Sequence, residues 1–447
     1  MLRLVFADLL ANARVWTGLV VVAVLSSLLG GLTAGFIESG VRQGGVTALA
    51  TFAISGVVIL FATIAAVVVM SSVASLTVSL QQRAYALWQV VGISPALVRF
   101  VVLAQVAVTS TAGASVGAVA APPLLPGVLD FVLDGATGFE DLQAAASFAG
   151  AAAAAVLVVL VAVSASATAA RSASRVSVIA AVRSTEQPAP PMGAGGLVRG
   201  GLLVLASLGL VLSQRGRPPA TAELPLLMAG VLLAAGVAAV GPALFPGVTA
   251  AWTRVVPGRV SSAWFLARAT ATDNVRRGAA TVGPLMLAVA LAGSLFSVDA
   301  TVVSAGGGSG EQGLPPQVVV LLVGGPIALA VVGATATVFM AGRARAAEFG
   351  LLRAAGATPG MIVAAAVCEA LIYTGTAFLV ALLVTFVTAT GAALAVQETA
   401  AGALPSLHLG EALVVAAASL ILMLCATVIP TLTDLRRSPR ATLAATT

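Results

Sequence analysis

The chain has 447 residues, of which 60% are apolar and only 9% are charged, and its mean hydropathy is +1.09. A soluble domain needs polar residues to cover its surface, so this composition excludes one and indicates an integral membrane protein. All 22 basic residues are arginine, and arginines that flank membrane spans explain the net charge of +6 without a nucleic-acid partner. Cys368 and Cys425 both lie inside apolar runs, which excludes a disulfide framework.

Ten apolar stretches of about 20 residues, the length that crosses a bilayer, follow one another along the chain. They fall near 15–36, 48–80, 97–122, 146–170, 197–213, 224–247, 279–298, 316–342, 360–388 and 411–433. The first is too long for the core of a cleavable signal peptide, so we expect it to remain in the protein. The fifth is the weakest, because only a short apolar run separates Arg199 from Arg215, and the sequence leaves open whether it crosses fully.

The distribution of charge predicts the orientation of these spans. If the N-terminus is cytoplasmic, only Arg42, Arg215 and Arg217 lie outside, and the other 19 of the 22 arginines lie in cytoplasmic segments. The abundance of Ala, Val, Gly and Arg, with no Lys, is typical of a bacterium with a GC-rich genome. We therefore expect a multi-pass protein of a bacterial plasma membrane with both termini in the cytoplasm.

Spans two and eight are predicted to be unusually long. No charge interrupts the chain between Arg42 and Arg83, or between Glu311 and Arg343. A helix of about thirty residues is about 45 Å long, which exceeds the hydrocarbon core of about 30 Å. Such a helix either tilts or projects into the cytoplasm as a lever, and the sequence does not separate the two.

Two stretches about 264 positions apart carry the same pattern of residues. Residues 85–95 have the sequence YALWQVVGISP, and residues 349–359 have the sequence FGLLRAAGATP. The Leu, Gly, Ser/Thr and Pro positions keep one offset, which indicates an internal duplication. Each stretch lies between two predicted spans on the cytoplasmic side. We expect the Gly to end a short helix there and the Pro to start the next span.

The duplication extends beyond this motif. An Asn-x-Arg ending closes a segment with helically spaced apolar residues at 12–14 and again at 274–276. Each segment is predicted to be an amphipathic interface helix, with a plain juxtamembrane flank as the alternative. The chain thus divides into a four-span repeat at 1–185, a two-span linker at 186–260 and a second four-span repeat at 261–447. Because the linker has an even number of spans, both repeats run the same way through the membrane.

The second motif, Glu348–Thr358, resembles the signature of FtsX-like (MacB-type) permease subunits of ABC transporters. That signature is roughly E-x-G/A-L-L-R-A-x-G-A-T/S, just after the second span of each unit. The first copy departs from it, with Ala84 in place of the acid and Gln89 in place of the Arg. The layout is similar to the ten-span bacitracin-efflux type. However, only Asp299–Pro316 stands where that group carries a large extracellular domain, and only Glu38–Thr47 where MacB-type chains carry a periplasmic one.

The resemblance implies that residues 82–93 and 345–357 are coupling helices, each seated in a cleft of a separate ABC ATPase subunit. The residues expected to contact the ATPases or to terminate the helices are Arg83, Leu87, Trp88, Gln89, Gly92, Glu348, Leu351, Leu352, Arg353 and Gly356. Apolar side chains would anchor and charged ones would set the register. An ordinary amphipathic interface helix with a Gly cap is the alternative.

Few polar groups lie inside the predicted spans. Gln105 and Glu369 occupy equivalent positions in spans three and nine, where a carboxylate is costly and is a candidate functional group. Pairing of Glu369 with a nearby arginine, Arg99 or Arg353, is the structural alternative. Gly residues spaced at four in span three, at 113 and 117, are typical of close helix packing. An outer loop at 122–146 holds four acids that either meet a cationic substrate or are simply solvated: Asp130, Asp134, Glu140 and Asp141.

The sequence contains no phosphate-binding G-x-x-x-x-G-K-[ST] motif, and without any Lys it cannot have one. It also shows no metal-ligand cluster and no nucleophile with its base, so we predict no enzyme activity. ATP and Mg²⁺ are expected to bind only to the partner ATPase subunits, two per permease.

The function that these patterns favour is an all-α permease subunit of an ABC transporter. It would couple ATP hydrolysis to export, or membrane extraction, of a hydrophobic or amphipathic compound such as an antibiotic, peptide or lipid, with antibiotic resistance as the leading role. The alternatives are an ion-coupled secondary transporter and a membrane scaffold that relays ATPase motion to an extracellular partner. Substrate, direction of transport and any extracellular partner stay open.

Overall fold

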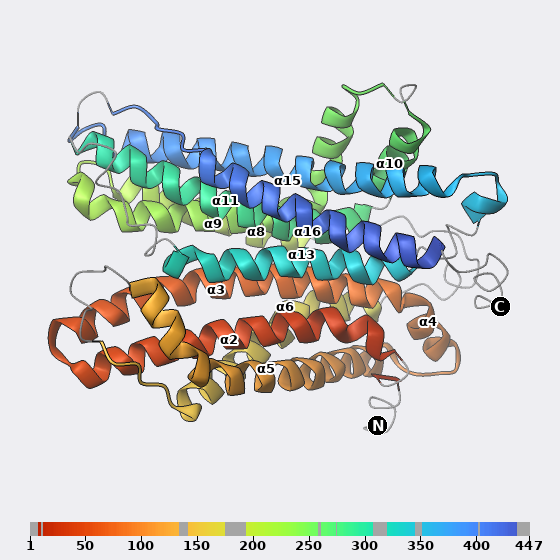
Figure 1. Cartoon of the computed structure of the whole chain (residues 1–447), viewed down its shortest axis with the longest axis horizontal. Coiled ribbons are helices and arrows are strands. Elements are labelled where there is room, and N and C mark those ends of the chain that lie inside the picture. Colours follow the sequence, from red (N-terminus) through yellow and green to blue (C-terminus); the bar gives the residue numbers. More distant parts are fainter. Residues whose placement is uncertain are drawn as a thin grey trace. The chain divides into compact units, whose positions relative to one another are not determined.

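A computed structural model describes residues 8–9, 12–133, 142–174, 194–257, 261–273, 275–306, 320–344, 351–400 and 403–435. Over these ranges the chain is helical and contains no strand. Ten of the helices are long and apolar enough to cross a membrane (Figure 1). The prediction of an all-α, multi-pass membrane protein with ten spans is confirmed.

The chain packs as two compact units. Unit 1 comprises Met1–Pro188 and Leu314–Gly333. Its described helices are α2 (Ala13–Gln43), α3 (Gly45–Leu80), α4 (Gln82–Val90), α5 (Pro95–Leu133), α6 (Phe148–Ala173), η2 (Val320–Gly324) and the first part of α13 (Gly325–Ala344). Helix α2 packs against α3, α5 and α6, and α6 also packs against α3 and α5. The short helix α4 lies at one end of this bundle, which we call the motif end (Figure 1).

Small residues let α2 and α5 approach closely. A Cβ atom added at Gly113 would lie 2.6 Å from the Val20 carbonyl oxygen, and one at Gly117 would lie 2.3 Å from that of Val24. Both distances are too short for a larger residue. The predicted close packing through these glycines is therefore confirmed, in the manner of membrane helices whose contacts depend on small residues.

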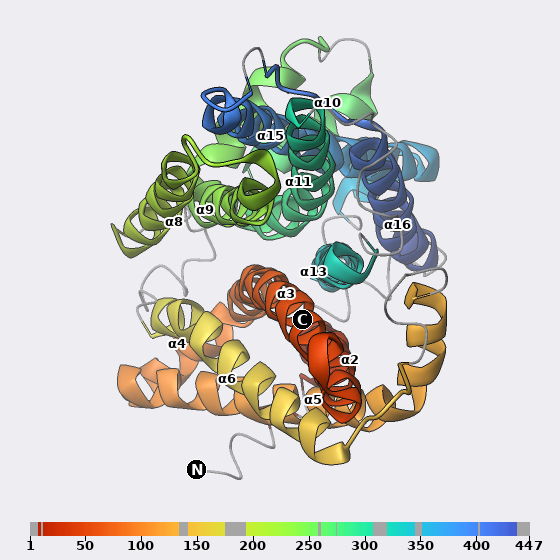
Figure 2. The ribbon, with the colours of Figure 1, turned by 90° about the vertical axis from the view of Figure 1, so that its left-hand side faces the viewer.

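Unit 2 comprises Ala189–Gly313 and Ala334–Thr447. Its described helices are α8 (Ala194–Ser213), α9 (Pro219–Thr253), α10 (Ser262–Asp273), α11 (Val275–Ala305), the rest of α13, α15 (Pro359–Val396) and α16 (Gly410–Leu435). Helix α11 is the centre of this unit, since every residue from Ala280 to Leu295 is buried. Helices α9, α15 and α16 pack against it, and α8 lies against α9 on the outside (Figure 2).

The fifth span is long enough to cross a bilayer. Helix α8 has 20 residues, which gives a length of about 30 Å, equal to the hydrocarbon thickness. Leu202, Leu205, Leu208 and Leu212 are exposed on it, as expected for a helix that faces lipid on most sides. The stretch therefore forms a complete helix although its apolar run in the sequence is short.

The two-span linker is tied to the second repeat by an aromatic and hydroxyl contact. The indole Nε1 of Trp252 in α9 donates a hydrogen bond of 2.9 Å to Thr376 Oγ1 in α15. The hydroxyl of Thr249 lies 3.1 Å from the same atom. The rings of Trp252 and Trp264 meet edge to face, with centroids 6.2 Å apart. Unit 2 thus contains the linker spans together with most of the second repeat, whereas the division of the sequence at 185 and 260 stays a prediction.

Helices α3 and α5 are both longer than a simple span. Helix α3 has 36 residues, about 54 Å, so the second span exceeds the hydrocarbon core as predicted. The predicted outer loop at 122–146 is wrong in its first part, because α5 continues to Leu133 through three prolines. Leu125 and Leu129 are buried against Phe36 of α2, and this packing holds the helical path despite the prolines. The predicted start of span eight lies outside the described residues.

Candidate functional site

The first motif segment ends α4 with a left-handed glycine. Gly92 has a φ of 97°, a conformation that favours glycine because it has no Cβ. Its N–H donates to the Gln89 carbonyl at 3.1 Å, and the Ile93 N–H donates to the Trp88 carbonyl at 3.0 Å. This pair of bonds is the Schellman arrangement, which satisfies carbonyl groups left open at a helix end.

The second motif segment makes the same turn. Gly356 has a φ of 95°. Its N–H donates to the Arg353 carbonyl at 3.1 Å, and the Ala357 N–H donates to the Leu352 carbonyl at 2.9 Å. Each donor and each acceptor stands at the offset of the repeat, so the duplication seen in the sequence is also a duplication of backbone geometry.

The following span begins in the same way in both copies. Ser94 Oγ accepts from the Leu97 N–H at 3.4 Å, and Thr358 Oγ1 accepts from the Met361 N–H at 3.3 Å. In each copy the next residue is the proline that opens α5 or α15. A hydroxyl before a proline caps a helix start and fixes the backbone there. We call α4 and the helical residues 351–354 the motif helices. Each is joined to the next span by a short turn with hydrogen bonds at the end of the motif helix and at the start of the span.

A leucine is exposed at the same position in both copies. Leu87 is 51% exposed and its equivalent, Leu351, is 65% exposed. Their neighbours Trp88 and Leu352 are half-buried. The Arg83 side chain and the whole of Glu348 lie outside the described residues.

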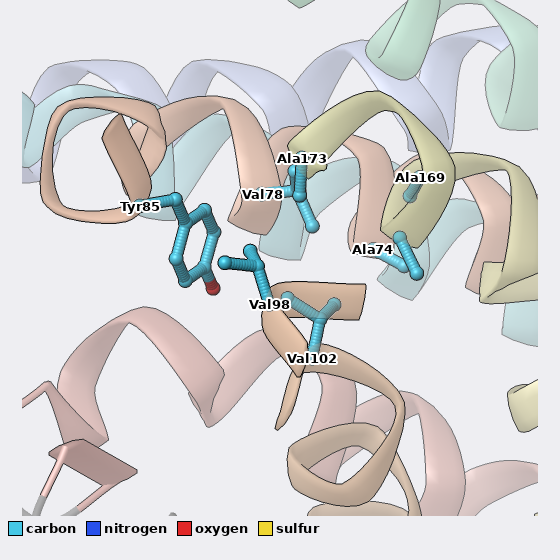
Figure 3. Packing of buried hydrophobic residues seen from close by; sticks show 8 residues of the cluster. Ala74, Val78, Tyr85, Val98, Val102, Ala169 and Ala173 are labelled. Atoms are coloured by element: carbon cyan, nitrogen blue, oxygen red, sulfur yellow. The ribbon is translucent and has the colours of Figure 1, made fainter. Parts of the chain in front are cut away.

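A buried tyrosine holds α4 against unit 1. Tyr85 is fully buried among side chains of three neighbouring helices (Figure 3). These side chains are Ala74 and Val78 of α3, Val98 and Val102 of α5, and Ala169, Ala170 and Ala173 of α6. The ring also meets Trp88 edge to face at 5.4 Å, and its hydroxyl donates to Gln81 Oε1. Burial raises the pKa of the Tyr85 phenol, and the nearby Asp8 carboxylate raises it further, so the hydroxyl remains a donor.

The polar residue in the last turn of each motif helix donates to the end of the last span of its own repeat. Gln89 Nε2 lies 3.5 Å from the carbonyl oxygen of Ala173, the final residue of α6. Arg353 Nη1 lies 3.5 Å from the carbonyl oxygen of Leu435, the final residue of α16. The two donors are equivalent in the repeat although one is an amide and the other a guanidinium.

The two predicted intramembrane groups are both buried. Gln105 is fully buried, and its Nε2 donates to Asp8 Oδ2 at 2.7 Å. Glu369 is 3% exposed. Arg99, one of the arginines considered as a partner for this carboxylate, is exposed on α5. Of the predicted outer acids, Asp130 is an exposed residue of α5, whereas Asp134, Glu140 and Asp141 lie outside the described residues.

Sequence reasoning missed a repeated contact at the opposite, far end of each unit. Near the end of α2, Ser39 Oγ donates to the Gly35 carbonyl at 2.7 Å and accepts from the Ala145 N–H at 2.8 Å, just before α6. The hydroxyl therefore fastens the start of the last span to the end of the first span.

The same contact recurs in unit 2. Thr301 Oγ1 in α11 donates to the Ser297 carbonyl at 2.6 Å and accepts from the Ser406 N–H at 3.1 Å, just before α16. Ser39 and Thr301 are separated by the same number of positions as the two Asn-x-Arg endings. This spacing is the signal that could have identified them.

Together, the ten spans and the twice-built motif turn define a multi-pass membrane protein in which one turn occurs twice. Residues 319–439 match the family model of the FtsX-like permease C-terminal domain. The resemblance to FtsX-like permeases that the motif predicted is therefore confirmed over this segment. No curated protein matches the chain. Within the described part of the chain, no group of three His, Cys, Asp or Glu residues is placed to hold a metal ion.

The match supports a permease subunit of an ABC transporter in general terms. An FtsX-like permease is a membrane subunit of a transporter and is not itself an enzyme, and such permeases typically pair with ABC ATPase subunits. The matched segment covers α13, α15, α16 and the second motif turn, so it contains the better-preserved copy of the signature.

Proposed function

We propose that this chain is the transmembrane permease subunit of a bacterial ABC transporter, with both motif helices acting as coupling helices on the cytoplasmic side. Each helix would seat in the cleft of one ATPase subunit, so that one chain engages two ATPases. The observation that carries the proposal is the recurrence of one turn, with Gly92 and Gly356 in the same left-handed conformation and an exposed leucine at the same position in each copy.

The chemistry of the exposed face suits this role. Leu87 and Leu351 offer an apolar anchor at a helix surface, which is the kind of residue that a partner cleft desolvates. The short, capped turn after each helix would carry a displacement directly into the next span. ATP and Mg²⁺ would bind to the ATPase subunits, which would supply the free energy of hydrolysis.

The substrate that we propose is a hydrophobic or amphipathic compound, such as an antibiotic, a peptide or a lipid, which the protein exports or extracts from the membrane. The excess of arginine on one side of the spans supports the placement of both motif helices in the cytoplasm. Resistance to an antibiotic is the physiological role that we would test first.

Purification of the tagged chain from its own membrane, followed by mass spectrometry of bound proteins, tests the proposal. The wild-type protein should retain an ABC ATPase, and Leu351→Asp should retain much less because a carboxylate replaces the apolar anchor. The matched control is Leu404→Asp, which makes the same change at an exposed leucine in the connection between α15 and α16. Equal ATPase recovery from both variants would remove the coupling role of this face.

Failure of the wild-type chain to retain any ATPase in mild detergent would favour the ion-coupled secondary transporter instead. The buried Glu369 would then be the group to study, since an ionisable residue inside a span is a candidate ion site.

A further inference from the structure

We propose that Gln89 and Arg353 are positioning residues that fasten each motif helix to the last span of its own repeat, so that α6 and α16 move with the motif helices. The inference rests on the proposed function, because it assigns a path of force transmission to the same two helices. It concerns two half-buried residues, whereas the proposed ATPase contact concerns the exposed leucines.

The geometry is the same in both units although the chemistry differs. Gln89 Nε2 donates to the carbonyl of Ala173, and Arg353 Nη1 donates to the carbonyl of Leu435, at 3.5 Å in each case. Ala173 is the final residue of α6, and Leu435 is the last described residue of α16. An amide and a guanidinium thus stand at equivalent positions and donate to equivalent targets.

The target explains the choice of donor. The last carbonyl groups of a helix, such as that of Ala173 in α6, have no partner within the helix and carry the negative end of its dipole. Gln89 and Arg353 are both half-buried, so water does not fully replace their contacts. The guanidinium makes the stronger bond, since a charged donor binds a carbonyl more tightly than a neutral amide does.

In unit 1 the fastening is reinforced by packing. Ala169 and Ala173 of α6 belong to the same buried cluster as Tyr85, so the motif helix and the last span share one core (Figure 3). Trp88 and Ile93, the residues joined by the Schellman bond, pack against the same core. A displacement of α4 therefore displaces the end of α6 through direct contact.

The far end of each last span is also fastened, because the Ser39 and Thr301 hydroxyls accept from the backbone just before α6 and α16. Helix α6 has 26 residues, about 39 Å, and a rigid element of this length carries motion between its ends. A push on the motif helix would then reach the far end of the first span, on the opposite side of the membrane.

Two substitutions at one position separate this role from direct binding of the ATPase. Arg353→Gln replaces the guanidinium by the amide that copy one already uses, so it should preserve the bond to Leu435. Arg353→Leu removes the donor. A charge contact with the ATPase would be lost equally in both variants, whereas a positioning contact is lost only in the second.

The test uses the complete chain with its co-purified ATPase in lipid nanodiscs, after Cys368→Ala and Cys425→Ala remove the native thiols. Spin labels at Leu224→Cys and Val414→Cys, exposed residues near the starts of α9 and α16, report the far end of the last span. A second pair, Leu224→Cys with Leu394→Cys, reports the far end of α15. Distances are measured by pulsed electron resonance with ADP and with ATP plus vanadate.

We expect the α16 distance to shift between the two nucleotide states in the wild-type chain and in Arg353→Gln, and the shift to fall by at least half in Arg353→Leu. The α15 shift should persist in all three. An unchanged α16 shift in Arg353→Leu, an equal loss in Arg353→Gln, or a wild-type α16 that does not shift would overturn the inference. Loss of the ATPase from the wild-type complex would instead count against the proposed function.

Discussion

The two motif segments share a backbone turn but differ in the residue that donates a hydrogen bond to the last span. In copy one, Tyr85 inserts a buried ring among three helices and Gln89 donates a neutral hydrogen bond. In copy two, the donor to the last span is the Arg353 guanidinium. Copy one therefore departs from the family signature in sequence while it retains the geometry. The comparison teaches that glycine, a hydroxyl and proline determine the turn, whereas the anchoring side chains are free to diverge.

The largest effect should come from the aromatic anchor of copy one. Tyr85→Ala leaves a cavity in the core at the motif end, and such truncations of buried aromatic residues cost about 3–5 kcal/mol. Tyr85→Phe loses only the hydrogen bond to Gln81, about 1 kcal/mol. The midpoint temperature of unfolding in detergent should fall much further for the first variant than for the second. Similar midpoints would show that α4 is not held by this ring.

The next largest loss of stability is expected from substitution of the glycine in the motif turn, and Gly360 provides a matched control. Gly356→Ala and Gly360→Ala make the same change four residues apart, and neither new Cβ meets an atom within 4 Å. Only Gly356 has a positive φ, so alanine there costs about 1–2 kcal/mol of backbone strain. At position 360, within α15, alanine should be neutral or stabilising by up to about 1 kcal/mol.

Gly92→Ala extends this test to copy one, since its φ matches that of Gly356. Equal losses of unfolding stability in Gly92→Ala and Gly356→Ala would confirm that the duplicated turn has the same energetic role in both units. A loss of stability in only one variant would show that the two turns differ in their energetic role.

A smaller loss of stability is expected at the end of each unit that lies opposite the motif helix, where the Ser39 and Thr301 hydroxyls are compared. Ser39→Ala and Thr301→Val each remove the acceptor for one loop N–H, at Ala145 and Ser406, and should each cost about 1 kcal/mol. Thr301→Ser should retain the bond. Hydrogen exchange at the N–H groups of Ala145 and Ser406 reports this directly, with faster exchange expected only in the variants that lack the hydroxyl.

The smallest effect concerns alkaline pH. The pKa of Tyr85 is raised from its usual value of 10.0 by burial and by Asp8, so the phenol ionises more readily in the unfolded chain than in the folded one. This contribution to stability is complete below pH 10 and is lost as the pH rises above it. The wild-type chain should therefore lose more stability above pH 10 than Tyr85→Phe does. Parallel pH profiles would contradict the burial of a protonated phenol.

Much of the fold could be predicted because the relevant signals are local. Composition and run length identified the ten spans, and the Gly-x-Ser/Thr-Pro pattern predicted both helix ends that Gly92 and Gly356 make. These features depend on residues a few positions apart, for which the physical rules are direct.

What could not be predicted depends on contacts between distant residues. The continuation of α5 past Pro122 follows from packing of Leu125 and Leu129 on Phe36, which no local pattern reveals. The Ser39 hydroxyl bonds to a loop 106 positions away. Gln89 and Arg353 were expected at the ATPase interface, and their donation to the last spans emerges only once the helices are packed.

Native mass spectrometry of the purified complex tests most directly whether each motif helix binds one ATPase subunit. Nucleotide is left out so that ATPase subunits do not associate with each other through bound ATP. We expect one permease chain with two ATPase subunits, and one chain with a single ATPase subunit for Leu87→Asp and for Leu351→Asp. A wild-type complex with one ATPase or none, or variants that still hold two, would contradict the claim that each motif helix seats its own ATPase.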